Sequence, residues 1–253
     1  MSPTDLLANE LFAVLLVFAR LAAIVMLLPG FGESYVDPRL RLWVSLLTSV
    51  LVAQALGDRL PAPPTSLPAW VAVVAGEVVL GLAIGSLVRL ALAALHVAGS
   101  IVALQSGLAA AAYFDPSEAT QGTVPGAFLS ILFLVLLFAT DGHHVLLGRI
   151  VEGYGTLPAG GPLPLGDLVE LATRLGSAAL ATGLAIAAPL LLAAFLANLA
   201  LGLLARLVPS LQVLFVALPL QLILALAVLA IGLAGGLAIA LRFLDRTSLW
   251  LAG

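Results

Sequence analysis

Long apolar segments, separated by short runs of proline, glycine and charged residues, dominate this chain. Charges and helix breakers divide it into six hydrophobic regions, residues 11–28, 42–56, 70–112, 127–140, 168–207 and 211–241. A helix needs about 20 apolar residues to cross a bilayer. The pattern therefore predicts an all-α, multi-pass membrane protein with roughly five to seven spans. We expect one membrane-embedded domain over residues 1–253.

Several of these regions do not match a single regular span. The third is too long for one tilted helix, so we expect the helix either to continue past the hydrocarbon or to bend near Ala98 and Gly99. Pro189 and Pro219 lie inside the last two regions, and proline removes a backbone hydrogen bond, so a kink or break is expected at each. The fourth region is conversely short. Long broken helices beside short ones are typical of a pore, and simple kinked packing is the alternative.

The charge content supports the membrane assignment. Ten arginines, thirteen acidic residues and no lysine make 9% of the residues charged, against roughly a quarter in a soluble domain. Such a chain cannot supply the charged surface that keeps a soluble globule dispersed. The net charge of −3 is spread out, and no basic patch indicates nucleic acid. The absence of cysteine excludes disulfides, thiolate nucleophiles and cysteine-ligated metal.

A few ionisable side chains lie inside the apolar regions, where burial is costly without a partner. Glu77 and Arg89 share the third region but lie about 120° apart around a helix, so they do not pair directly. We expect Arg20, in the first region, to neutralise Glu77 across two helices as an interhelical polar clamp. Asn198 and Arg206 are further clamp candidates. An ion or proton relay is the functional alternative.

Gly81 and Gly85 follow Glu77 with the spacing Gly-x-x-x-Gly. Small residues at this spacing let two helix backbones approach closely in a membrane. We therefore expect an intimate helix contact here, either within the chain or with a partner subunit.

Asp141, His143 and His144 have the side chains of a metal site but not its usual spacing. Adjacent histidines in a helix point about 100° apart, and zinc ligands on one helix prefer positions i and i+3 or i+4. We predict no metal and no cofactor, with Asp141 capping a helix that begins at His143. A pH-sensing role for the two histidines is an alternative.

No catalytic or nucleotide-binding motif is evident. No serine lies in a Gly-x-Ser-x-Gly context, no paired aspartates occur within the spans, and glycine-rich phosphate loops are missing. We therefore predict that the protein is not an enzyme.

The loop that begins at Gly107 has an unusual composition. Small residues lead to Tyr113 and Phe114, which precede Asp115 and Pro116. This order fits either a compact turn with an aromatic plug or an interfacial aromatic anchor, and composition alone favours the anchor.

Several strings occur in the order found in one family. They are Arg20, Leu28-Pro29-Gly30-Phe31-Gly32, Pro38-Arg39-x-Arg41, Gly76-Glu77 with Gly81 and Gly85, Gln105-x-Gly107, Asp115-Pro116, Asp141-Gly142-His143-His144, Leu157-Pro158, Ala188-Pro189, Asn198-Leu-x-Leu-Gly202, Arg206-x-x-Pro209 and Phe215-x-x-x-Pro219. Together they cover nearly the whole chain. The chain resembles the FliR/SctT export-gate proteins of bacterial flagellar and type III secretion systems. The Asp-Gly-His-His string is more like the flagellar members.

The resemblance implies long, kinked helical hairpins, much of which stand above the bilayer plane. It implies one export-gate domain that assembles with FliP and FliQ homologues in the inner membrane, at the flagellar basal body, with FlhB and FlhA nearby. Unfolded flagellar proteins would pass through this gate. An injectisome gate subunit is the first alternative, and a stand-alone transporter of small solutes or ions is the second.

The resemblance also changes the interpretation of the unusual loop. The matching loop of the family closes the pore from inside, which makes Tyr113 and Phe114 candidate plug residues, with Gly107, Asp115 and Pro116 beside them. This chain has alanines at residues 109–112, where some family members have a bulky aromatic. We expect its seal to depend more on the two aromatic side chains that follow.

Overall fold

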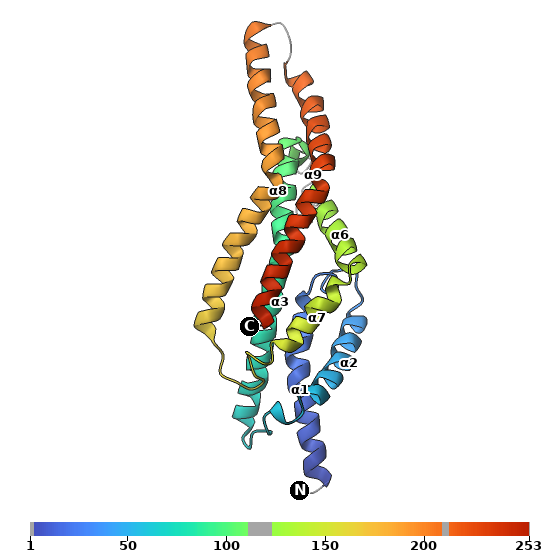
Figure 1. Ribbon diagram of the computed structural model, residues 1–253, viewed down its shortest axis with the longest axis vertical. Coiled ribbons are helices and arrows are strands. Elements are labelled where there is room, and N and C mark those ends of the chain that lie inside the picture. The colour runs from blue at the N-terminus through green and yellow to red at the C-terminus, as the bar shows by residue number, and fades with distance from the viewer. Residues whose placement is uncertain (1–2, 111–122, 209–212, 253) are drawn as a thin grey trace. The chain divides into compact units, whose positions relative to one another are not determined.

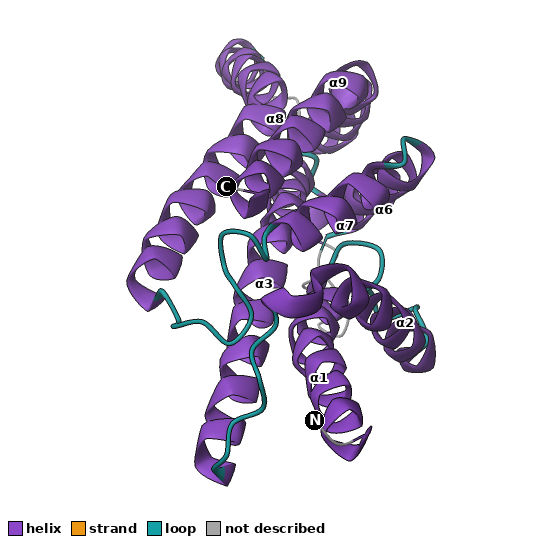
Figure 2. Ribbon diagram, turned by 60° about the horizontal axis from the view of Figure 1, so that its bottom comes forward, coloured by secondary structure: helices purple, strands orange, loops and turns teal. Residues whose placement is uncertain are grey.

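The computed structural model describes residues 3–110, 123–208 and 213–252, and within these ranges the chain forms helices and no strand (Figures 1 and 2). The all-α prediction is therefore confirmed. The helices are α1 (Pro3–Leu27), α2 (Pro38–Leu56), η1 (Gly57–Arg59), α3 (Leu67–Gln105), η2 (Leu108–Ala110), α6 (Val124–Ala139), α7 (Gly142–Glu152), α8 (Leu165–Leu207) and α9 (Val213–Ala252).

Five of these helices are long and apolar enough to cross a membrane, or six if α6 and α7 together form one broken span. This number agrees with the predicted multi-pass protein. With 39 residues, α3 is about 58 Å long, roughly twice the hydrocarbon thickness. It continues through Ala98 and Gly99 as one helix, and its length is greater than a single crossing of the hydrocarbon needs.

The prolines of the last two helices do not interrupt them. Pro189 lies inside α8 and Pro219 inside α9, and both helices run on without a break. Each proline removes one backbone donor, and the turns on either side remain hydrogen-bonded. Of the two expected outcomes, neither proline breaks its helix, and a kink at each remains a prediction.

The chain forms two compact units, each assembled from separate segments. The first unit comprises Met1–Leu90, Thr140–Leu175 and Leu244–Gly253, and the second comprises Ala91–Ala139 and Gly176–Phe243. The expectation of one domain over residues 1–253 remains a prediction.

The core of the first unit is built around α1. Phe12, Leu16, Leu21 and Ile24 on α1 are buried, and so is Leu28, the residue that follows this helix. Phe12 and Leu21 lie on opposite sides of the helix, so burial extends over more than one face of α1. The next helix, α2, has a capped N-terminus. It begins after Asp37, whose carboxylate accepts a hydrogen bond from the backbone N–H of Arg39 at 2.7 Å.

The second unit is packed through small residues. A Cβ at Gly99 on α3 would overlap the backbone of Gly126 on α6, and a Cβ at Gly183 on α8 would lie 2.8 Å from Cβ of Val97. Between α3, α8 and α9, a cluster of Val102, Leu190 and Ala225 is buried. Close backbone approach therefore replaces bulky side chains at these crossings.

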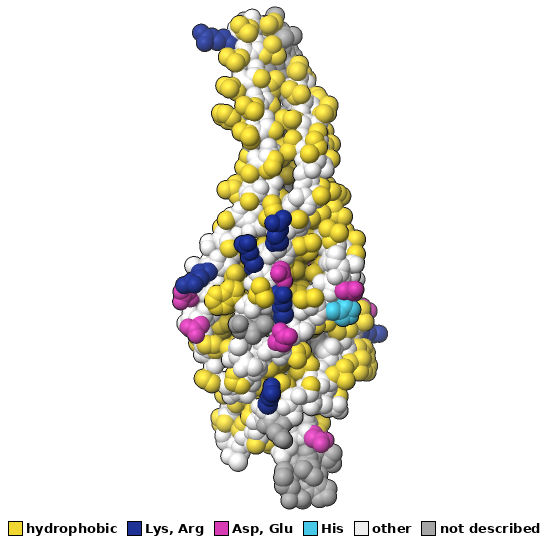
Figure 3. All heavy atoms as spheres, viewed as in Figure 1, with side chains coloured by type: hydrophobic (Ala, Val, Ile, Leu, Met, Phe, Trp, Pro, Cys, Tyr) yellow, Lys and Arg dark blue, Asp and Glu magenta, His cyan; other side chains and the backbone are white. Residues whose placement is uncertain are grey.

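Large apolar side chains also cover much of the surface. Figure 3 shows hydrophobic side chains over the α8 and α9 segments of the second unit, with few charges among them. Phe195, Ile223 and Ile231 are 65%, 66% and 86% exposed. Exposed apolar surface of this extent is typical of a protein covered by lipid or by partner helices.

Candidate functional site: a buried ion pair between two helices

Arg20 on α1 and Glu77 on α3 form a buried ion pair in the first unit. Nε of Arg20 lies 2.5 Å from Oε2 of Glu77, and Nη2 donates to Oε1 at 3.1 Å. Both side chains are 2% exposed. The guanidinium therefore binds the carboxylate through two parallel hydrogen bonds, in a bidentate geometry. This is the contact that the cost of burying either charge alone predicts.

The glycines that follow Glu77 explain how the two helices come close enough. A Cβ at Gly81 would overlap the backbone oxygen of Arg20 and lie 2.7 Å from Cβ of Ala23. A Cβ at Gly85 would lie 2.9 Å from Cβ of Leu27. The close approach expected from Gly-x-x-x-Gly is therefore present, between α1 and α3 of this chain.

The loop between α7 and α8 completes the site. Nη1 of Arg20 donates to the carbonyl of Leu157 at 2.7 Å, and Nη2 donates to that of Pro158 at 3.4 Å. The backbone N–H of Gly160 donates to Oε1 of Glu77 at 2.7 Å. These three bonds tie the loop to both helices through the ion pair.

Gly160 has a φ of +71°, which is the left-handed region where glycine is favoured. This conformation belongs to the turn from which its N–H reaches Glu77.

Tyr154 covers the guanidinium. The Cζ atom of Arg20 lies 4.3 Å from the centre of the Tyr154 ring, within the range of a cation–π contact. Burial raises the pKa of the Tyr154 hydroxyl; the nearby Arg20 opposes this rise and Glu77 adds to it. The hydroxyl therefore stays protonated at physiological pH.

The geometry favours a polar clamp over a proton relay. Oε1 of Glu77 already accepts two hydrogen bonds and Oε2 one, which are the interactions that offset the desolvation of a buried carboxylate. A relay needs a neighbouring group that can pass on the proton. The buried Tyr154 hydroxyl has no hydrogen-bond partner among the described residues.

The other clamp candidates do not join this site. Arg89 faces Glu33 at 3.7 Å with its side chain 41% exposed, so this pair is weak. Asn198 on α8 accepts a 3.0 Å hydrogen bond from Gln221 on α9. Arg206 is exposed in the last turn of α8, where a positive charge is favourable to the helix dipole.

Gly107 is the one plug candidate that the structure describes. It follows the end of α3 and has a φ of +77°, which favours glycine at this turn. Tyr113, Phe114, Asp115 and Pro116 lie outside the described residues.

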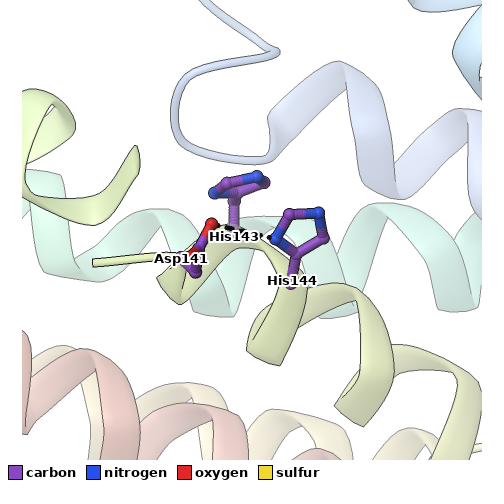
Figure 4. A group of neighbouring side chains, drawn as sticks. All are labelled: Asp141, His143 and His144. Carbon is purple, nitrogen blue, oxygen red and sulfur yellow. Dashed lines mark ion pairs between the residues drawn. The ribbon is translucent and has the colours of Figure 1, made fainter. Parts of the chain in front are cut away.

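Asp141 and the two histidines depart from two expectations. Asp141 is the N-cap of α7, which begins at Gly142, but its side chain makes no capping bond. The centroids of the His143 and His144 rings lie 4.0 Å apart, so the expectation that adjacent histidines diverge is wrong here (Figure 4). At the end of a helix, rotamers can bring neighbouring rings together despite the 100° offset of their Cα–Cβ bonds.

Several contacts of the site could not be found from the sequence. The loop contributes two backbone carbonyls and one N–H, groups that almost every residue possesses. The only signal was that Arg20 has more donors, and Glu77 more acceptor positions, than their hydrogen bonds to one another use.

Comparison with known proteins gives a consistent result. Residues 11–247 match the bacterial export proteins, family 1. The flagellar biosynthetic protein FliR of Caulobacter vibrioides is 36% identical over 83% of this chain and 83% of its own length. The FliR protein of Escherichia coli is 32% identical over 78% and 75% of the two chains. Yop proteins translocation protein T of Yersinia pestis is 27% identical over 83% and 81%.

Proposed function

We propose, from the premise that this chain belongs to family 1 of the bacterial export proteins, that it forms a flagellar protein-export gate with FliP and FliQ homologues. The observation that carries the proposal is the 36% identity to a flagellar FliR protein over 83% of both chains. The same level of coverage to Yop proteins translocation protein T comes with only 27% identity, which favours the flagellar system over an injectisome.

The proposed gate lies in the bacterial inner membrane, at the flagellar basal body, with FlhB and FlhA as neighbours. Lipid and partner helices cover the exposed apolar side chains of α8 and α9. Unfolded flagellar proteins are the cargo, and the chain has no catalytic role. The five long apolar helices and the membership of an export family support this placement.

A stand-alone transporter fits the structure less well. A transporter site needs polar groups free to bind the ion or solute. The single acidic residue buried among the described helices, Glu77, is already saturated by Arg20 and the backbone of Gly160.

Co-purification tests the proposed assembly. We expect the full chain, carrying an affinity tag and expressed with its FliP and FliQ homologues, to draw both out of detergent-solubilised membranes as one complex. An unrelated tagged inner-membrane protein is the control. Purification of the chain as a single species that transports a small solute in vesicles would overturn the proposal, as would normal flagella in a deletion strain.

The aromatic side chains of the loop after Gly107 are the proposed plug. We expect cells carrying Tyr113→Ala with Phe114→Ala to leak ions, because two bulky side chains are removed next to a run of alanines. Ion leakage is measured in cells whose gate complex assembles at the normal level. Leakage equal to that of the unaltered protein, in a normally assembled complex, would remove the plug assignment.

A further inference from the structure

Asp141, His143 and His144 lie close together at the start of α7, outside the ion-pair site. One potential ligand atom from each residue lies within 4.8 Å of the others. Figure 4 shows the three side chains on the same side of the first helical turn. Contrary to the prediction of no metal from their spacing in the sequence, we infer that they form a binding site for a divalent transition-metal ion.

The backbone turn before α7 creates this arrangement. Asp141 has a φ of 56° and a ψ of 18°, the left-handed conformation, which is rare for a residue with a Cβ. The N–H of His144 donates to the carbonyl of Asp141 at 3.0 Å. The aspartate side chain folds back along this turn, and its Oδ1 lies 3.3 Å from Nδ1 of His144.

The donor set selects the class of ion. Two imidazole nitrogens and one carboxylate oxygen suit zinc and the neighbouring metals cobalt, nickel and copper, rather than calcium or magnesium, which prefer oxygen ligands. Three protein ligands leave at least one coordination position for water or for a ligand from another molecule.

The present spacing needs only a small adjustment. Zinc bonds to nitrogen and oxygen are about 2.0–2.2 Å long, so two ligand atoms on one ion lie about 3–4 Å apart. The His144 and Asp141 side chains are 70% and 78% exposed, so they can rotate toward an ion without disturbing packed neighbours. One potential ligand atom from each of the three residues already lies within 4.8 Å of the others.

The local electrostatics are consistent with a bound cation. The positive end of the α7 dipole opposes a cation at this position, but the Asp141 carboxylate supplies a compensating negative charge. A shared ion would also hold the left-handed Asp141 in place at the start of α7.

Metal titration of the purified full chain, carrying a tag without histidine, tests the site. After chelator treatment and its removal, Co²⁺ is added and the visible absorption is followed; Zn²⁺ affinity is then measured by competition with a chromophoric chelator. We expect one ion per chain and a cobalt spectrum with nitrogen and oxygen ligands. His144→Ala and Asp141→Asn should each weaken Zn²⁺ binding by at least about tenfold, since even the loss of an outer-shell partner costs that much.

The third histidine of the chain provides a matched control. His96 lies 3.4 Å from Ser130 in the second unit, away from the three ligands in sequence. His96→Ala should leave the Zn²⁺ affinity and the cobalt spectrum unchanged.

Two outcomes would overturn the metal site. The first is that the unaltered chain binds Zn²⁺ no more strongly than His144→Ala does. The second is that His96→Ala loses as much Zn²⁺ affinity as His144→Ala, which would indicate an adventitious ion only. If His143→Ala lowers the yield of folded chain, His144→Ala decides the matter, because its side chain is largely in solvent.

Discussion

Replacing Glu77 with alanine is expected to lower the free energy of unfolding by about 3–5 kcal/mol, because Arg20 would keep its charge in a buried site without a counterion. The two side chains are each 2% exposed, so water does not replace the lost carboxylate without opening the packing. The loop would also lose the bond from Gly160 to Glu77. Thermal or denaturant unfolding of the purified chain in detergent measures the change, and motility of complemented cells reports its consequence for export.

A double variant separates the charge from the packing. Arg20→Met combined with Glu77→Leu should be less destabilised than either Arg20→Met or Glu77→Leu alone, since no buried charge is left unpaired. Arg89→Ala is the matched control, because its pair with Glu33 is partly exposed and should contribute about 0–1 kcal/mol.

Tyr154→Phe provides a second control inside the same site. It removes only a buried hydroxyl without a partner among the described residues and keeps the ring over Arg20, so little change is expected. If Glu77→Ala unfolds at the same point as Arg89→Ala, the ion pair does not stabilise the protein as we propose.

The second large effect is expected from a single methyl group at Gly81. In Gly81→Ala, the new Cβ would overlap the backbone oxygen of Arg20 and lie 2.7 Å from Cβ of Ala23. Neither group is the flexible end of a side chain, so α1 and α3 must move apart. Overpacking typically costs about 1–3 kcal/mol, and here the separation would also stretch the bonds between Arg20 and Glu77.

Gly176→Ala is the control for Gly81→Ala. Gly176 lies inside α8, and a Cβ there meets nothing within 4 Å. Alanine is the better helix former by roughly 0.5–1 kcal/mol, so this variant should be as stable as the unaltered chain or slightly more stable. Unfolding measurements that rank the two variants equally would show that helix propensity, not the contact with α1, decides the effect.

The site shows which residues can be predicted to meet. Arg20 and Glu77 could be paired from the sequence because each is too costly to bury alone, and few other charges lie in the apolar regions. Arg89 could be excluded from Glu77 by the helix repeat alone. Its partner Glu33 could not be found, because that residue lies in a turn whose direction has no periodic signal.

The histidine prediction failed because it assumed an ideal helix, and the proline prediction is only partly tested. Pro189 and Pro219 were expected to kink or break α8 and α9; both helices continue past the prolines, which excludes a break and leaves the kinks as a prediction. The divergence of His143 and His144 was predicted from an ideal helix, but the left-handed Asp141 precedes them and their rings converge. The helix repeat gives the average direction of a side chain, and the backbone of the neighbouring turn decides its direction in this protein.

The amino-acid sequence alone determined that this protein is helical, that it is embedded in a membrane and that Arg20 and Glu77 each require a counterion when buried. These properties depend on the transfer of residue types out of water, which is set by composition and helical spacing. Only the tertiary structure decided that Gly81 lies against the backbone of Arg20, and that the carbonyls of Leu157 and Pro158 complete the ion pair. It also brought Asp141 beside His144. These contacts depend on how the helices pack and how the loops turn, which the residue types alone do not determine.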